Sequence, residues 1–254
     1  MRPLRHRNTA RPGTGLARAL SKLGICSRSQ GWELIAAGHV TVNGVARRDP
    51  EWRVDLERDH FEVNGKAVRP PAKVYLMLNK PRGLVTTASD EQGRPTVFDC
   101  LAEANLPFVA PVGRLDKASE GLLLLTNDTA WAAQLTDPES HLEKVYHVQL
   151  DCVADETLAD RLMQGVRSEG EFLSAKRASV LRQAKSTSWL EIVLDEGKNR
   201  HIRRLLAALG VNVVRLIRVA IGELPLGNLP KGKFRRLTET EVRALNAGAG
   251  TRPT

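Results

Sequence analysis

Hydrophobic residues near the start of the chain follow the spacing of two short helices. Leu16, Leu20 and Leu23 recur at helical intervals, and Gly24 is a typical helix stop. Ser27 has the side chain of a helix N-cap. The pattern therefore predicts a second helix that begins after this serine and ends near residue 38.

Alternating apolar and polar residues follow this helix pair. The segments HVTVNGVA at 39–46 and FEVNGKAV at 61–68 each contain an Asn-Gly pair, which predicts two β-hairpins. Two helices and two hairpins suffice for a compact domain. We place this domain at residues 14–72.

The rest of the chain mixes strand and helix patterns without strict alternation. Its first segment, KVYLMLNKPRGLVTT, is an apolar strand interrupted by Pro81 and Gly83. Further strand patterns lie at 121–126, 144–150, 189–195 and 213–219, and helical patterns lie at 129–136, 155–164 and 200–209. This order predicts an α+β domain at residues 73–243, with a mixed, mostly antiparallel sheet flanked by helices.

Both ends of the chain lack such patterns. Residues 1–13 are basic and are interrupted by proline and glycine, which predicts a disordered tail. An organellar targeting segment is the alternative, because no acidic residue precedes Glu33. The final letters AGAGTRPT predict a second flexible tail, at residues 244–254.

Composition limits the partners and the cellular compartment. A hydrophobic fraction of 42% over 254 residues supports a folded core, and a formal net charge of +9 favours a polyanionic partner. No segment approaches the roughly 18 apolar residues of a membrane span, and the N-terminus lacks the apolar core of a secretory signal. Cys26, Cys100 and Cys152 have neither disulfide density nor zinc spacing. We expect a reduced, cytoplasmic monomer without a metal ion or a membrane partner.

The predicted helix pair carries side chains suited to phosphate groups. The first 32 residues contain seven lysines and arginines and no acidic residue. Side chains suited to phosphate contacts in this domain are Arg18, Lys22, Arg28, Arg47 and Arg48, with Ser27 and Ser29. A solvated basic surface and a helix-turn-helix DNA reader are the alternatives. The segment LARALSKLGICSRSQGWELIAAGHVTVNGVARRDP resembles the alpha-L RNA-binding motif of ribosomal and RNA-modifying proteins, and the resemblance implies that this domain binds structured RNA, with Arg18, Lys22, Ser27, Arg28 and Ser29 as candidate contacts.

A second candidate site surrounds the segment VGRLDKASEGLLLLTND at 112–128. The four leucines at 122–125 predict a strand buried on both faces, and Asp116 lies in the loop before this strand. A carboxylate held rigidly beside a buried strand suits a nucleophile or a general base. The alternative is an ordinary surface ion pair with Lys117 or Arg114.

Two further segments carry candidate side chains. KVYHVQL places Tyr146 in a strand, where its ring either stacks on a flat ligand or packs in the core. In DEGKNRHIRRLLAALG, Asn199 is the predicted N-cap of a helix that ends at Gly210. Its apolar residues have the spacing of one buried helix face.

The arginines of this helix are expected to differ in their surroundings. Arg203 lies at the border of the buried face, so we expect it to be half-buried and to pair with a carboxylate. Asp116 is the predicted partner, because a guanidinium can hold a carboxylate at two points. Arg200 and Arg204 are expected to face solvent or nucleic acid.

Together, the motifs GRLDKASEGLLLLTND, KVYHV and EGKNRHIRRLL resemble those of the pseudouridine synthases that modify ribosomal RNA, and LNKPRGLVTT resembles the family's lead-in strand. The resemblance extends from residue 73 to about residue 240. It implies a pseudouridine synthase catalytic domain behind the alpha-L RNA-binding domain. The implied activity is cofactor-free isomerisation of a specific uridine in ribosomal RNA.

The resemblance also implies roles for individual residues. Asp116 would be the covalent catalyst, Arg203 would keep it charged and oriented, and Tyr146 would stack on the uracil ring. Arg114 would support flipping of the uridine out of the RNA, and a salt bridge with Glu120 is the alternative for this arginine. The competing functions are a non-catalytic ribosome-assembly factor and an enzyme that acts on transfer RNA.

Overall fold

The structure is a computed structural model of the chain, and it describes residues 13–68, 71–88 and 90–250. The predicted basic tail at residues 1–13 lies outside the described residues, apart from Gly13. Within the described residues, no helix has the length and apolar character needed to cross a bilayer.

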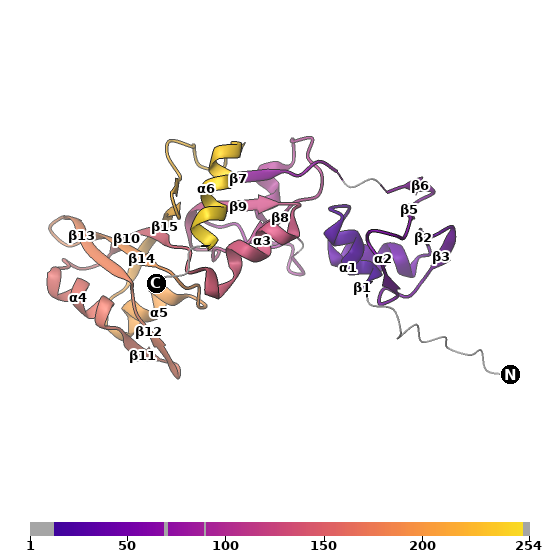
Figure 1. The fold of residues 1–254 in the computed structure, drawn as a ribbon. Helices are drawn as coiled ribbons and strands as arrows, with labels where there is room; N and C mark the ends of the chain where they lie inside the picture. Colours follow the sequence, from indigo (N-terminus) through magenta and orange to yellow (C-terminus); the bar gives the residue numbers. More distant parts are fainter. Residues whose placement is uncertain (1–12, 69–70, 89, 251–254) are drawn as a thin grey trace. The chain divides into compact units, whose positions relative to one another are not determined.

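The chain forms two compact units, which are drawn in Figure 1. The first unit runs to Val74 and also includes Asn105–Ala110 and Asn127–Thr129. The second unit contains the remaining segments. Two short segments from the later part of the chain therefore belong to the first unit, which a division into consecutive blocks does not anticipate.

The first unit contains the predicted helix pair. Helices α1 (Leu16–Lys22) and α2 (Arg28–Ala36) share an apolar cluster whose fully buried members include Leu16, Leu20 and Ile35. Ser27 caps α2 as predicted. Its hydroxyl accepts a hydrogen bond from the Gln30 amide at 3.2 Å, and its own amide donates to the Gln30 side chain at 3.0 Å.

Both predicted hairpins are present in the first unit. The strands are β1 (Thr14–Gly15), β2 (Val40–Val42), β3 (Val45–Arg47), β4 (Arg53–Val54), β5 (Phe61–Val63) and β6 (Lys66–Ala67). Strands β2 and β3 form one hairpin, β5 and β6 form the other, and pairing of β2 with β5 joins them in one sheet. The residues of both turns have φ between 52° and 77°, the left-handed backbone that favours Asn-Gly: Asn43, Gly44, Asn64 and Gly65.

The second unit is built on a nine-stranded sheet. Its strands are β7 (Tyr75–Lys80), β8 (Ala110–Val112), β9 (Glu120–Thr126), β10 (Lys144–Leu150), β13 (Arg177–Gln183), β14 (Ser188–Leu194), β15 (Val213–Ile221), β16 (Leu224–Pro225) and β17 (Phe234–Arg236). Their order is β13–β14–β10–β15–β9–β7–β17, with β16 beside β15 and β8 beside β9. β9 runs parallel to β15, whereas the neighbours from β13 to β15 and from β9 to β17 pair antiparallel. The predicted mixed, mostly antiparallel sheet is confirmed.

Helices cover this sheet and complete its core. They are α3 (Thr129–Thr136), α4 (Glu156–Gln164), α5 (His201–Ala208) and α6 (Glu239–Gly250), with the 3-10 turns η1 (Val97–Leu101) and η2 (Pro138–Ser140). Helices α4 and α5 pack with β10, β14 and β15 in one apolar cluster, and α3 and α6 pack with β7 and β9 in another. A separate hairpin of β11 (Val166–Ser168) and β12 (Glu171–Leu173) lies outside the large sheet.

Strand β9 is the centre of the region around the candidate site. All seven of its residues are buried, and the four leucines at 122–125 are essentially inaccessible to solvent. β9 pairs with β7 on one side and with β15 on the other. The predicted strand buried on both faces is therefore confirmed.

The predicted flexible tail at residues 244–254 is wrong in its described part. Residues up to Gly250 continue α6, and residues 251–254 lie outside the described structure. Val242, Leu245 and Ala249 lie at helical spacing and join the apolar cluster of α3, β7 and β9. Burial of this face stabilises a helix that the small residues AGAG do not predict by themselves.

Candidate active site

A cavity of about 550 Å³ opens beside the sheet of the second unit. The predicted residues Arg114, Asp116, Tyr146, Arg200 and Arg203 all line it. This volume lies within the usual range for a small-molecule site. The cavity therefore unites side chains that are up to 89 positions apart in the sequence.

The loop that carries Asp116 is fixed through its backbone. Lys80, with 0% of its surface exposed, donates from Nζ to the carbonyl oxygens of Asp116 at 3.1 Å, Ser119 at 2.8 Å and Pro81 at 3.1 Å. The Ser119 amide also donates to the Asp116 carbonyl at 2.9 Å. Burial lowers the pKa of Lys80 to about 8, although the charges of Asp116 and Glu120 oppose this shift.

Sequence analysis missed the role of Lys80. The available signal was a lysine at the end of the apolar strand LMLNK, immediately before Pro81. The segment after that proline also holds the Asp116 loop, because the Gly83 amide donates to Lys117 O at 2.7 Å and the Thr86 hydroxyl donates to Leu115 O at 2.7 Å. The lead-in strand thus acts as the support for the loop.

The predicted ion pair between Asp116 and Arg203 is not formed. Arg203 donates to the carbonyl oxygens of Ala118 at 3.2 Å and Val213 at 3.2 Å. In the part of the chain that the structure describes, the Asp116 carboxylate has no hydrogen bond or salt bridge. The prediction failed because two carbonyl groups occupy the guanidinium, so that Arg203 holds the loop through Ala118.

Arg203 nevertheless lies within the electrostatic field of Asp116. Burial lowers the pKa of Arg203, Arg200 lowers it further, and the charge of Asp116 opposes both effects. Arg203 is half-buried, as expected for its place at the helix border. A free carboxylate beside a guanidinium is suited to attack an electrophilic carbon or to remove a proton.

Tyr146 lies in β10 and lines the same cavity. Its neighbours across the sheet are Ile192 on β14 and Arg218 on β15. The ring is half-buried and packs against the apolar cluster of α4 and α5. This position leaves part of the aromatic side chain available to a flat ligand in the cavity.

Helix α5 differs from the prediction at its start and agrees at its end. The N-cap is Arg200, with φ 48°, so the expected cap at Asn199 is wrong. His201 is the first helical residue, and Gly210, with φ 78°, follows the end of the helix as predicted. Ile202 is buried, as expected for the apolar face.

Arg204 does not face solvent, and this expectation is wrong. Its side chain is 12% exposed and forms ion pairs with Glu171 at 2.6 Å and Glu169 at 3.1 Å. A third contact runs from Nη2 to the carbonyl oxygen of Ser168 at 2.8 Å. The β11–β12 hairpin supplies these acceptors, which a helical pattern alone does not reveal. Arg200, in contrast, is exposed at the cavity.

Arg114 is exposed and lines the cavity, and its alternative partner is engaged elsewhere. Glu120 binds Arg215 at 2.7 and 3.0 Å and Lys231 at 2.6 Å. The hydrogen bonds from Arg215 lower the pKa of Glu120 to about 2, against burial, and Lys231 lowers it further. The alternative of an Arg114–Glu120 salt bridge is therefore wrong.

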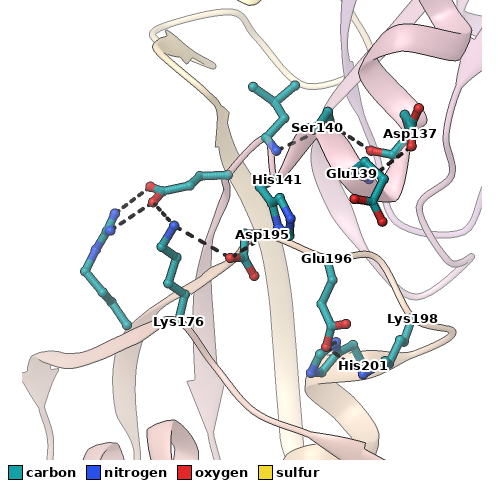
Figure 2. Close-up of polar contacts among 12 residues, drawn as sticks. Asp137, Glu139, Ser140, His141, Lys176, Asp195, Glu196, Lys198 and His201 are labelled. Carbon is teal, nitrogen blue, oxygen red and sulfur yellow. Dashed lines mark hydrogen bonds and ion pairs between the residues drawn. The ribbon is translucent and has the colours of Figure 1, made fainter. Parts of the chain in front are cut away.

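Another part of the cavity lining, residues 195–201, carries close pairs of charged and polar side chains, which Figure 2 shows. Asp195 lies 3.6 Å from Lys176 and 3.9 Å from His141. Glu196 lies 2.8 Å from Lys198 and 3.6 Å from His201, whose pKa is lowered by burial. The sequence did not predict these pairs, because two of the partners, His141 and Lys176, lie on other segments of the chain.

The candidate RNA contacts of the first unit lie on its surface. Arg18, Lys22, Arg28 and Ser29 are exposed, whereas the Ser27 hydroxyl is used to cap α2. Among the described residues, no group of three or more His, Cys, Asp or Glu side chains is placed to hold a metal ion.

Comparison with protein families gives two matches. Residues 74–208 match the family described as RNA pseudouridylate synthase, and residues 14–60 match the S4 domain. These segments lie in the second and the first unit respectively, apart from residues 74, 105–110 and 127–129, which belong to the first.

Individual relatives cover almost the whole chain. A Rickettsia typhi protein named "Uncharacterized RNA pseudouridine synthase" is 40% identical over 231 residues, which is 91% of this chain and 94% of that protein. The "Ribosomal large subunit pseudouridine synthase B" of Bacillus subtilis is 37% identical over 235 residues, with 91% and 95% coverage. A crystal structure of a pseudouridylate synthase superposes with a TM-score of 0.65 at 28% identity, and covers 92% of this chain and 100% of that one.

Proposed function

The chain belongs to the RNA pseudouridine synthases, and from this premise we propose that it isomerises a specific uridine of ribosomal RNA with Asp116 as the attacking group. As a family member it is an isomerase, and its S4 domain binds RNA. The choice of ribosomal RNA is supported by the name of the Bacillus subtilis relative. The proposed domain limits are 14–72 for RNA binding and 73 to at least 243 for catalysis.

The observation that carries the assignment of Asp116 is its free carboxylate in the cavity. Its loop is fixed from below by Lys80, while the carboxylate itself has no hydrogen bond or ion pair with any residue that the structure describes. The backbone is therefore rigid and the oxygen atoms remain available to a substrate. This combination favours covalent attack, because the reacting group needs no rearrangement of its own contacts.

The isomerisation breaks the bond between N1 and C1′, joins C5 to C1′, and moves one proton from C5 to N1. Asp116 supplies an electron pair to the intermediate. The pair either forms a covalent bond that keeps the intermediate attached to the protein, or it balances the charge that develops when the N1–C1′ bond breaks. Arg203 positions the loop of Asp116 through its hydrogen bond to the carbonyl oxygen of Ala118. Tyr146 stacks on the detached ring and restricts its turn within the cavity.

A uridine must leave the RNA stack to enter this cavity, at a cost of a few kcal/mol. Arg114, exposed at the cavity, fills the vacated space or holds the neighbouring phosphate. The exposed groups Arg18, Lys22, Arg28 and Ser29 contact phosphates elsewhere and offset this cost, and Arg200 adds a contact near the cavity. A cytoplasmic location and a monomeric state remain predictions of the same proposal.

The experiment is a map of pseudouridines in ribosomal and transfer RNA from cells with and without the gene. We expect one or a few ribosomal sites to disappear and to return when the intact gene is restored. A gene carrying Asp116→Asn should leave these sites unmodified. Loss confined to transfer RNA would refute the ribosomal substrate and leave the family activity intact.

A further inference from the structure

Arg218 is a buried cation that the mechanism above does not use. It lies on β15, with 6% of its surface exposed, and lines the same cavity as Asp116. Its Nε donates to the carbonyl oxygen of Leu122 at 2.7 Å, which fixes the guanidinium plane. Within the described residues, its Nη2 is buried and has no hydrogen-bond partner, and no carboxylate forms a salt bridge with it.

The sheet is locally modified at this arginine. Val145 pairs with Ala220 and Tyr146 pairs with Arg218, so β15 carries one extra residue, Val219, in a β-bulge. Bulges re-aim side chains and are common beside active sites. On the other neighbour of β15, Gly121 pairs with Arg218 and has φ 100°, and an added Cβ atom would collide with the Arg218 backbone. Both features place Arg218 at its position in the cavity.

Two neighbours define what a ligand of Arg218 would meet. Tyr146 is directly opposite Arg218 on the adjacent strand, so the two side chains share one face of the sheet. Lys144 lies two residues along the same strand and also lines the cavity. Burial lowers the pKa of Lys144 to about 8, the charge of Arg218 lowers it further, and Asp195 opposes both effects.

A buried guanidinium with a free donor is costly unless a ligand supplies an acceptor. An RNA phosphate is a poor match, since Arg218 lies in the sheet beneath the cavity rather than at the exposed rim. A ring stacked on Tyr146 would place its edge near Arg218. Uracil presents two carbonyl oxygens, which only accept hydrogen bonds, and a guanidinium only donates them.

On the basis of the proposed function, we propose that Arg218 is a further catalytic residue, whose Nη2 donates to a carbonyl oxygen of the target uracil and stabilises the negative charge that the ring acquires. If Asp116 attacks C1′, the bond to N1 breaks and its electron pair stays on the ring. If it attacks C6, the electron pair of the C5–C6 double bond moves toward the C4 carbonyl. Both routes place charge on the oxygen atoms that Arg218 faces. The charge is removed when C5 bonds to C1′, the carboxylate leaves with its electron pair, C5 loses a proton and N1 gains one.

The test compares Arg218→Gln with the wild-type protein in single-turnover reactions on ribosomal RNA transcribed in vitro with uridine or with 5-fluorouridine. Removal of the donor should lower the rate constant on uridine by about 10²- to 10³-fold, while RNA affinity changes less than twofold. The loss should be at least several-fold smaller on 5-fluorouridine, measured as its disappearance, because fluorine itself stabilises a negative ring.

Arg218→Lys provides a second variant with the charge retained, in case the glutamine variant does not fold, and it should show the same dependence on fluorine. Arg215→Lys is the matched control, because Arg215 lies on the opposite face of β15 and binds Glu120. Loss of its two-point contact with Glu120 should lower stability, but the rate constant of the folded variant should stay within about threefold of the wild-type value, because Arg215 does not line the cavity.

Two results would overturn the proposal. One is a rate constant for folded Arg218→Gln within threefold of wild type. The other is an equal loss on both RNAs, which would mean that Arg218 acts by orienting Asp116 instead of stabilising the ring. If the wild-type protein forms no pseudouridine in ribosomal RNA, the proposed substrate fails first, and that outcome is separate from both.

Discussion

The two walls of the cavity are held in different ways. The nucleophile wall, residues 113–120, is fixed by the buried Lys80, by Arg203 and by hydrogen bonds to backbone carbonyl groups. The ion-pair wall, residues 195–201, is fixed by partly exposed ion pairs, such as Lys176–Asp195 and Lys198–Glu196. The hydrogen-bond donors that hold the nucleophile wall are shielded from water, whereas the ion pairs of the ion-pair wall remain in contact with water.

This difference follows the requirements of the chemistry. A covalent catalyst must be held in place within a fraction of an ångström, and buried hydrogen bonds to the backbone provide such restraint. Exposed ion pairs contribute little to stability, so the ion-pair wall is expected to be held less firmly than the nucleophile wall. We therefore expect substitutions in the supports of the nucleophile wall to affect catalysis and stability more strongly.

Among the supports of the two walls, the largest effect is expected for Lys80→Met, which keeps an apolar side chain of similar length and removes all three donations. The free energy of unfolding should fall by about 2–4 kcal/mol, since the carbonyl groups lose their partner. Turnover should fall about 100-fold, because the loop that carries Asp116 loses its position. Chemical denaturation and single-turnover kinetics measure both quantities.

Lys231→Met is the control for this comparison. Lys231 is half-exposed and supports the same loop only through Glu120, which keeps its contacts with Arg215. Its effect on unfolding should stay within about 1 kcal/mol. Equal effects of the two lysine substitutions would remove the distinction between a buried and an exposed support.

An intermediate effect is expected for Arg203→Lys. An ammonium group keeps the charge, but it does not bridge the carbonyl groups of Ala118 and Val213 as a planar guanidinium does. Turnover should fall about 10- to 100-fold with RNA affinity unchanged. Arg204→Lys, at the next position, should leave turnover within threefold, because its partners belong to the β11–β12 hairpin. Similar kinetic losses in both variants would argue against a specific role for Arg203.

A comparison in stability alone uses one carboxylate from each wall, and its smallest expected effect is that of Glu196→Gln. The side chain of Glu120 is 4% exposed, and that of Glu196 is 37% exposed. Glu120→Gln should lower the free energy of unfolding at pH 7 by about 3 kcal/mol, whereas Glu196→Gln should change it by less than about 0.5 kcal/mol.

The pH dependence sharpens this prediction. The pKa of Glu120 is about 2 in the folded protein, below the ordinary 4.5, so its stabilisation is complete above pH 4.5 and is lost as pH falls toward 2. The difference between wild type and Glu120→Gln should therefore shrink over this range, as measured by urea titrations at successive pH values. A difference that stays constant from pH 7 to pH 3 would contradict this account of Glu120.

Local patterns in the sequence predicted several elements of both units. The leucine run predicted β9, the Asn-Gly pairs predicted both hairpins of the first unit, and Ser27 predicted the start of α2. These features depend on neighbours along the chain, so a single sequence contains the necessary information. The gathering of Asp116, Tyr146 and Arg203 is different, because these residues are far apart in the sequence and the family resemblance implied that they meet.

The partners of buried charges were not predictable in this way. Arg203 had a carboxylate and two carbonyl groups within its reach, and the choice between them depends on loops far apart in sequence. Arg204 forms its ion pairs with acidic residues of the β11–β12 hairpin, whose sequence carries no strong strand pattern. Lys80 and Arg218 resemble ordinary strand residues until the tertiary structure shows what surrounds them.

The central claim is that the rigid wall presents Asp116 as the attacking group. Its most direct test is the single-turnover rate of pseudouridine formation by purified Asp116→Asn, a substitution that removes the charge and preserves the shape. The account predicts a loss of at least about 10⁴-fold, with RNA affinity and thermal unfolding unchanged. Product formation within tenfold of the wild-type rate would contradict it.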